Sequence, residues 1–371
     1  MASGYSLKDQ LFNADTVGYL AGLFAADPNF DAPEFTAQVL AEFPSRELKQ
    51  RIDWIAVCLA EQIGVDLPHA APLLRAALPP PLDPTLKDDD FGRFIFASLG
   101  EYVVLAGLDG HPDLALDLIE DITQRFSMEY AVRPFLARYP DLVLARFARW
   151  ADHPNYHVRR LVSEGSRPRL PWGAGVGLSP EATLPLLDTL HGDDARFVTR
   201  SVANHLNDIA KTHPDLVLER LARWRDEGRQ DARELRWMVN HALRGLVKAG
   251  HPEAMAMLGY AADVALNCTV TVPSKVRIGD VLTLECSLTA AQKTPVLVDY
   301  IVWFARDGGA PRRKVFKLKT GTIMPGTPLV LTKGHRMKGD ATTFRLTPGA
   351  HAIEIQVNGQ VRARAEFTLQ P

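Results

Sequence analysis

The sequence predicts two domains of different fold class: an all-α domain over residues 1–262 and an all-β domain over residues 263–371. Apolar residues recur at helical spacing in the first, whereas β-branched residues alternate with polar ones in the second. The charge divides too: the chain from Val264 onward carries 15 Lys and Arg against 7 Asp and Glu, and the remainder carries 27 against 37. A basic domain joined to an acidic one indicates that the basic domain meets a polyanion, although a solvated basic surface has the same composition.

The helical pattern is clearest from Leu48 to Ile63, where apolar residues recur every three or four positions and therefore share one helix face. Ser45 suits the start of this helix, and Gly64 suits its end. Residues 79–90 (PPPLDPTLKDDD) are predicted to form a loop, because consecutive prolines cannot continue a helix.

The helical domain repeats itself. The string PDLVLARFARW at 140–150 returns as PDLVLERLARW at 214–224, which is 74 residues later, or two periods near 37. An arginine followed four positions later by an acid or amide also recurs every 35 to 40 residues; the pairs are Arg125 and Glu129, Arg160 and Glu164, Arg200 and Asn204, and Arg236 and Asn240. Helix pairs with this period predict an α-solenoid of HEAT-like repeats. Since positions four apart share a helix face, stacked repeats would present these pairs on one concave surface.

These pairs also have a plainer interpretation as surface salt bridges, which are common and contribute roughly 0 to 1 kcal/mol each. An arginine that precedes the acid is the less favourable order for such a pair within a helix. Their recurrence in four consecutive repeats favours a functional interpretation, because the inner surface of a solenoid is where its ligand usually binds.

The repeat is interrupted after Glu164 by residues 165–173, which contain two prolines. The prolines exclude a helix there, so Glu164 is expected at a helix C-terminus, where the helix dipole disfavours a carboxylate. Arg167 and Arg169 can hold this carboxylate ionised. Trp172 offers an indole that either stacks on a base or sugar or fills a gap between repeats.

The second domain consists of short alternating segments separated by turn signals, among them 307–309, Pro325-Gly326 and Asn358-Gly359. The expected strands lie in VTVPSKV, VLTLECSL, VLVDYIVWF, KVFKLKTG, LVLTKGH, TFRLTPG (343–349), HAIEIQVNG and VRARAEFTL. Seven or eight strands in roughly 105 residues predict an immunoglobulin-like β-sandwich, here without the Cys…Trp…Cys spacing of antibody domains.

Composition excludes several classes of protein. No run of 18 apolar residues exists to span a membrane, and the first residues lack the pattern of a secretory signal. Three cysteines leave at least one unpaired, and no Cys or His spacing typical of a metal site is present. We therefore expect a cytoplasmic protein without a bound metal.

SEGSRPRLPW at 163–172 resembles the signature of the AlkC-type DNA alkylation-repair glycosylases. The resemblance extends over the helical half through four further motifs: LKDQLFN (7–13), FIFASLGEYV (94–103), FSMEYAVRPF (126–135) and SVANHLNDI (201–209). The β-domain resembles the additional immunoglobulin-like domain found in one branch of this family.

This resemblance implies a HEAT-like-repeat DNA glycosylase that excises cationic N3-alkylated bases, 3-methyladenine and 3-methylcytosine, from duplex DNA by hydrolysis of the N-glycosidic bond. It implies a monomer that needs no metal or organic cofactor, and a recognition mode without rotation of the base into a tight pocket. The acidic site residues of the family fall on Glu129, Glu164 and Asp208, and its indole falls on Trp172. Asn204 occupies the simple repeat register, and Asp208 lies one turn beyond it.

An N3-methylated base is already a good leaving group, so catalysis requires stabilisation of a cationic sugar and a positioned water. Carboxylates can do both, and we assign Glu164 and Asp208 to this role with Glu129 beside them. The expected phosphate contacts are Arg160, Arg167, Arg169, Arg200 and Lys211 in the helical domain and Arg312, Arg313 and Lys314 in the sandwich, with Lys319, Lys333, Arg336 and Lys338 near them.

Two alternatives remain at this stage. One is a non-catalytic helical scaffold that binds a protein partner on its concave face, as most helical-repeat proteins do. The other is a protein that binds damaged DNA without cleaving it.

Overall fold

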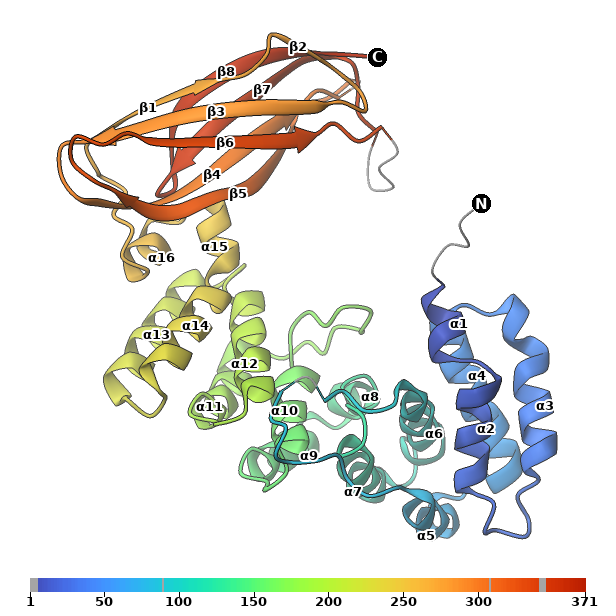
Figure 1. Cartoon of the computed structure of the whole chain (residues 1–371). Helices are drawn as coiled ribbons and strands as arrows, with labels where there is room; N and C mark the ends of the chain where they lie inside the picture. The colour runs from blue at the N-terminus through green and yellow to red at the C-terminus, as the bar shows by residue number, and fades with distance from the viewer. Residues whose placement is uncertain (1–5, 89, 307, 340–344) are drawn as a thin grey trace. The chain divides into compact units, whose positions relative to one another are not determined.

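The computed structural model describes residues 6–88, 90–306, 308–339 and 345–371. It contains two compact units, Met1–Thr212 with Leu221–Ala242 and His213–Arg220 with Leu243–Pro371. Helices follow one another along the first two thirds of the chain, and strands make up the rest (Figure 1). The predicted order, a helical-repeat part followed by an immunoglobulin-like β part, is confirmed.

The helical part begins at Leu7 and ends at Met257. Its α-helices are α1 (Leu7–Leu11), α2 (Ala14–Leu23), α3 (Ala32–Glu42), α4 (Leu48–Ile63), α5 (Leu67–Ala77), α6 (Ala97–Gly107), α7 (Pro112–Thr123), α8 (Val132–Arg138), α9 (Pro140–Trp150), α10 (Tyr156–Gly165), α11 (Pro180–Leu190), α12 (Arg196–Ile209), α13 (Pro214–Glu227), α14 (Ala232–Ala242), α15 (Arg244–Ala249) and α16 (Pro252–Met257). The 3₁₀ helices η1 (Phe43–Ser45) and η2 (Phe94–Phe96) precede α4 and α6. The described residues between Leu78 and Asp90 form no helix or strand, as the prolines predict.

Helix α4 shows how the local sequence sets a helix. Its N-cap is Glu47 and not the predicted Ser45, which belongs to η1. The Glu47 side chain accepts a hydrogen bond from the backbone N–H of Gln50, and the Gln50 side chain accepts one from Glu47 N at 2.8 Å. This reciprocal capping box satisfies two N–H groups that a serine alone would not. The helix ends at Gly64 as predicted, because φ there is +93°.

The second helices of successive repeats stack as the register predicts, α10 against α12 and α12 against α14. The first position of that register is different. Arg125 and Glu129 do not lie on a helix, because α7 ends at Thr123 and α8 begins at Val132. The Arg125 guanidinium donates to Asp121 O and Pro79 O, both at 2.7 Å, so it binds a carbonyl of the last turn of α7 and a carbonyl of the preceding loop.

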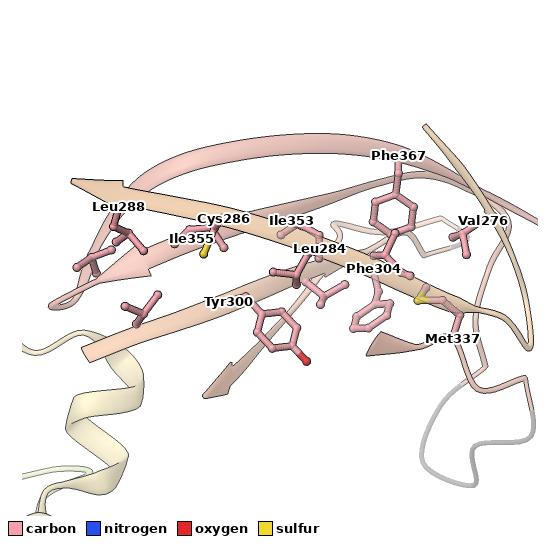
Figure 2. Packing of buried hydrophobic residues seen from close by; sticks show 14 of the residues in the cluster. Val276, Leu284, Cys286, Leu288, Tyr300, Phe304, Met337, Ile353, Ile355 and Phe367 are labelled. Atoms are coloured by element: carbon pink, nitrogen blue, oxygen red, sulfur yellow. The ribbon is translucent and has the colours of Figure 1, made fainter. Parts of the chain in front are cut away.

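The β part is a sandwich of two sheets. The strands are β1 (Leu266–Thr271), β2 (Lys275–Arg277), β3 (Val281–Ala290), β4 (Thr294–Phe304), β5 (Arg312–Ile323), β6 (Leu329–Arg336), β7 (Gly349–Val357) and β8 (Gln360–Gln370). One sheet has the order β1-β3-β6, and the other has the order β2-β8-β7-β4-β5. Alternate residues of β3 are buried, and Figure 2 shows three of them, Leu284, Cys286 and Leu288, in the core with side chains such as Tyr300 and Ile353.

Two strand predictions change in the structure. The segment VTVPSKV contains the end of β1 and the start of β2 with a break between them, because Pro273 has no N–H to continue a ladder. In the predicted segment 343–349, Thr343 and Phe344 lie outside the described residues, Arg345–Pro348 form no strand, and Gly349 starts β7.

The predicted turn at 358–359 joins β7 to β8, with positive φ at both residues. In the predicted turn at 307–309, Asp307 lies outside the described residues.

Candidate active site

The three predicted carboxylates come from three different segments. Glu164 lies in the last turn of α10, which ends at Gly165 as the proline-rich segment predicts. Asp208 lies in the last turn of α12, and Glu129 lies in the linker between α7 and α8. The negative poles of two helices therefore disfavour two of these acids, so the surroundings must supply positive charge.

Two arginines supply that charge and bring the acids together. Arg160 Nη1 lies 2.8 Å from Glu129 Oε2, and Arg160 Nη2 lies 3.7 Å from Glu164 Oε2. Arg167 Nη1 donates to Glu164 Oε1 at 2.6 Å, while its Nε and Nη2 donate to Asp208 Oδ2 at 3.0 and 2.9 Å. We call these five residues, Glu129, Arg160, Glu164, Arg167 and Asp208, the acid–arginine chain.

The acid–arginine chain is largely buried, with 5% of Glu164, 6% of Asp208 and 8% of Arg167 exposed. Burial alone raises the pKa of Glu164, but Arg160, Arg167 and a 2.6 Å hydrogen bond from Ser201 Oγ outweigh it, and the pKa is lowered. Burial likewise opposes the charge of Arg167, whose pKa is nevertheless raised by Glu164 and Asp208. Glu164 is thus an anion at neutral pH, held in fixed geometry by groups that cannot leave it without leaving a buried charge unpaired.

Arg133 holds the loop that follows Glu164. The residue is 3% exposed, and its guanidinium donates to three backbone carbonyls, Gly165 O at 2.8 Å, Arg167 O at 3.0 Å and Ala174 O at 2.8 Å. One side chain therefore ties the start of the loop to its end. The loop geometry that places Arg167 between two acids depends on this residue.

Trp172 protrudes from that loop. It is 63% exposed, so it does not fill a gap between repeats. Its φ of +64° is a left-handed conformation that is unfavourable for a residue with a side chain. Lys49 Nζ donates to Trp172 O at 3.0 Å, and Tyr130 Oη donates to the preceding Pro171 O at 3.0 Å. An exposed indole on strained backbone that other elements hold in place is typical of a binding site.

The basic residues of the helical domain that were predicted to contact phosphates differ in their burial and in their partners. Arg160 and Arg167 belong to the acid–arginine chain, where the three acids pair with them, and this pairing does not suit the predicted phosphate contacts. The prediction that Arg167 can hold Glu164 ionised agrees with their ion pair and with the lowered pKa of Glu164. Lys211 Nζ pairs with Asp208 Oδ1 at 2.8 Å, yet 44% of its side chain is exposed. Arg200 pairs with Asp88 of the 79–90 loop. Arg169 is exposed, two residues before Pro171.

The sequence offers two positions on the same helix for the third site residue, Asn204 in the repeat register and Asp208 one turn beyond it. The Asn204 side-chain oxygen lies 2.9 Å from His241 Nε2, toward the next repeat. Asp208 is the residue that Arg167 connects to Glu164. The acid of the acid–arginine chain on α12 is therefore Asp208, one turn beyond the position that the simple repeat register indicates.

In the sandwich, Arg312, Arg313 and Lys314 lie on β5, an edge strand of the five-stranded sheet. Arg313 Nη2 also donates to Gln356 Oε1 at 3.1 Å. Lys333 and Arg336 lie on β6, an edge strand of the other sheet. The basic residues thus follow two edge strands, where side chains stay accessible to a ligand.

Sequence reasoning missed Ser201 and understated Arg133. Arg133 stands in the motif FSMEYAVRPF, but its hydrogen bonds to loop carbonyls have no sequence signal. Ser201 directly follows Arg200, and only the packing of α12 on α10 brings its hydroxyl to Glu164.

The described residues contain neither a candidate metal site nor a candidate membrane-spanning helix. Within these ranges, no three His, Cys, Asp or Glu side chains are grouped so that they could hold a metal ion, and Cys58, Cys268 and Cys286 are all free. Among the described residues, no helix has the length and apolar character that crossing a membrane requires.

Fold and site together define a helical-repeat protein with largely buried, arginine-paired carboxylates and an exposed indole, joined to an immunoglobulin-like sandwich. Residues 121–246 match the model of the family "DNA alkylation repair enzyme", and residues 266–371 match that of the C-terminal Ig-like domain of the uncharacterised protein YhaZ. The protein YhaZ of Bacillus subtilis is 31% identical over 365 residues, which cover 96% of this chain and 98% of YhaZ.

A solved structure is similar over the whole length. It is the alkylpurine DNA glycosylase AlkC of Pseudomonas fluorescens, bound to DNA that contains an abasic site analogue. The match has a TM-score of 0.86 and 31% sequence identity, and it covers 99% of this chain and 100% of that one. The chain therefore belongs to the AlkC-type DNA alkylation-repair family, in the branch that carries a C-terminal Ig-like domain.

Proposed function

We propose that this protein is a monofunctional DNA glycosylase that excises N3-alkylated bases, 3-methyladenine and 3-methylcytosine, from duplex DNA. The observation that carries the proposal is the acid–arginine chain, in which Glu164 and Asp208 are fixed on one guanidinium beside the loop of Trp172. The similarity to AlkC, whose structure holds DNA with an abasic site analogue, supports the same activity.

The chemistry follows from the charge of the substrate. The alkylated base is a cation and leaves with the electron pair of the C1′–N bond, while positive charge develops on the sugar. Carboxylates already fixed in place stabilise that charge without reorganisation during the reaction. Water then adds its oxygen to C1′ and loses a proton. We assign Glu164 and Asp208 to these two tasks, with Glu129 favouring the cationic base or sugar and Trp172 stacking on the nucleotide.

DNA binding is then divided between two surfaces. Arg169, Arg200 and Lys211 are the contacts that we assign to phosphates near the lesion, because they retain exposed surface around the buried acids. Arg312, Arg313 and Lys314 on β5 are the contacts that we assign to the duplex outside it. Arg160 and Arg167, in contrast, hold carboxylates. The protein acts as a monomer without a metal or organic cofactor.

The test is release of free base from duplex DNA that carries 3-methyladenine or 3-methylcytosine. The proposal predicts release above the rate without enzyme, unaffected by EDTA, with an intact abasic strand as the other product. Binding to the damaged duplex without release would leave a damage-binding protein. Neither binding nor release would favour a scaffold for a protein partner.

A further inference from the structure

A cavity of about 260 Å³ lies in the first unit, outside the acid–arginine chain. Its wall comes from α4, η2, α6, the α7–α8 linker, α8 and the loop that carries Trp172. Most of the lining is apolar or aromatic, with Phe94, Met128 and Tyr130 among the larger side chains. A small cavity of this kind with a few polar groups suits a molecule of one or two rings.

The polar groups on the wall include two acids, Asp53 and Glu101, and two cations, Lys49 and Arg133, of which Arg133 is held by loop carbonyls. Asp53 projects from α4 and Glu101 from α6, and no hydrogen bond or ion pair to another side chain occupies either acid among the residues that the structure describes. Burial, and to a lesser extent Asp53, raise the pKa of Glu101 to about 6 against the pull of Lys49. Lys49 itself donates to Trp172 O, so its ammonium is engaged by the loop. The wall thus offers two acceptors to a ligand with N–H donors.

The cavity shares two segments with the acid–arginine chain. Ser127 and Tyr130 line the cavity, while Glu129 between them binds Arg160. Residues 172–175 form another part of the wall and belong to the loop that Arg133 ties to Arg167. A base released beside Glu129 and Trp172 would therefore meet this cavity next.

We propose that this cavity binds the free alkylated purine after its glycosidic bond has broken. The inference rests on the proposed function. In the balanced reaction, water and the cationic nucleotide give the sugar C1′–OH, a neutral base and one proton, so the ligand that enters is a neutral, flat heterocycle. Its amino group donates to Asp53 and Glu101, and its ring packs against the aromatic wall.

Equilibrium dialysis of the full chain with free 3-methyladenine tests this proposal. 3-Methylpurine serves as the control ligand, because it has the same ring system and methyl group but lacks the exocyclic amino group. The wild type binds 3-methyladenine at least about tenfold more tightly than 3-methylpurine, since the carboxylates receive no amino donor from the control. Failure to bind 3-methyladenine, or equal binding of both bases, would overturn the proposal.

Two variants locate the binding. Glu101→Gln removes a charged acceptor and weakens binding by about tenfold or more, and Ala97→Phe fills the cavity from α6 and abolishes binding. Glu34→Gln on α3 is the matched control, because Glu34 is exposed and does not line the cavity. Unchanged binding in Glu101→Gln and in a folded Ala97→Phe variant would contradict the assignment.

Inhibition separates this inference from the proposed function. Free 3-methyladenine slows multiple-turnover excision by the wild type, and Glu101→Gln needs about tenfold more free base for the same inhibition. A wild-type protein that excises nothing refutes the proposed function, whereas dialysis still reports on the cavity. A protein that excises bases but binds none of them free refutes the cavity alone.

Discussion

Arg167 donates to a single carboxylate oxygen of Asp208 through both Nε and Nη2, at 3.0 and 2.9 Å, while its Nη1 donates to Glu164. One planar guanidinium thus sets the distance and orientation between two buried acids that lie on different helices. An ammonium group has the charge but not this forked geometry.

Replacing Arg167 by lysine should therefore damage both stability and excision. Breaking a buried, hydrogen-bonded ion pair costs about 3 to 5 kcal/mol, so Arg167→Lys should lower the free energy of unfolding in urea by an amount approaching that range. Arg169→Lys is the control, because Arg169 is exposed, and it should change this free energy by less than about 0.5 kcal/mol. Equal urea midpoints for both variants would contradict a structural role for Arg167.

Trp172 should matter for excision and little for folding. Trp172→Gly removes an exposed indole and relieves a φ of +64°, so the free energy of unfolding should stay within about 1 kcal/mol of the wild type. Single-turnover excision and affinity for damaged duplex should both fall, and Trp172→Phe should retain part of each because a phenyl ring still stacks. A strongly destabilised Trp172→Gly variant would show that the indole serves the fold.

Much of the architecture follows from local pattern. The alternation after Ala262 and the 74-residue repeat predict the order of the two parts and the stacking of α10, α12 and α14. The burial of Arg160 and Arg167 was not predictable in the same way. Spacing along one helix tells which residues share a face, but Arg160 pairs with Glu129 of the α7–α8 linker and Arg167 pairs with Asp208 of α12, and such contacts between segments have no local signal.

Glu129 is instructive for a different reason. The sequence placed it on a helix with Arg125, yet it lies in the α7–α8 linker and still binds Arg160. The periodicity misjudged the backbone at Glu129, whereas the family motif singles out this residue without requiring a helix there. The ion pair with Arg160 holds the Glu129 side chain at the site although its backbone is not helical.

The basic edge of the sandwich should contribute to DNA affinity in a salt-dependent way. The double variant Arg312→Gln and Lys314→Gln should reduce the slope of log affinity against log salt by about 1 to 2, because each phosphate contact contributes about 0.9. Lys275→Gln with Arg277→Gln is the matched control on β2, the opposite edge of the same sheet. Equal slopes in the two double variants would remove β5 from the DNA interface.

Asp299 in the sandwich should make stability depend on pH. The side chain is buried at a β-bulge of β4, and burial raises its pKa to about 6 against the pull of Lys317 and Lys248. A folded-state pKa above the unfolded value means that the charged form is penalised above pH 6, and that this penalty vanishes as the pH falls toward 4. Asp299→Asn should stabilise the protein by about 2 to 3 kcal/mol at pH 8 and by little at pH 4. Thermal melts at both pH values measure this; an equal gain at both would contradict the shift.

The most direct test of the account is single-turnover excision of 3-methyladenine by Glu164→Gln and Asp208→Asn, measured together with affinity for the same duplex. Each amide keeps the shape of the acid, and circular dichroism checks that each variant is folded. The account predicts a fall in excision of about a hundredfold or more with equal or tighter DNA binding, because a catalytic charge is lost and a repulsion from phosphates disappears. Excision at the wild-type rate, or loss of binding in proportion to excision, would contradict it.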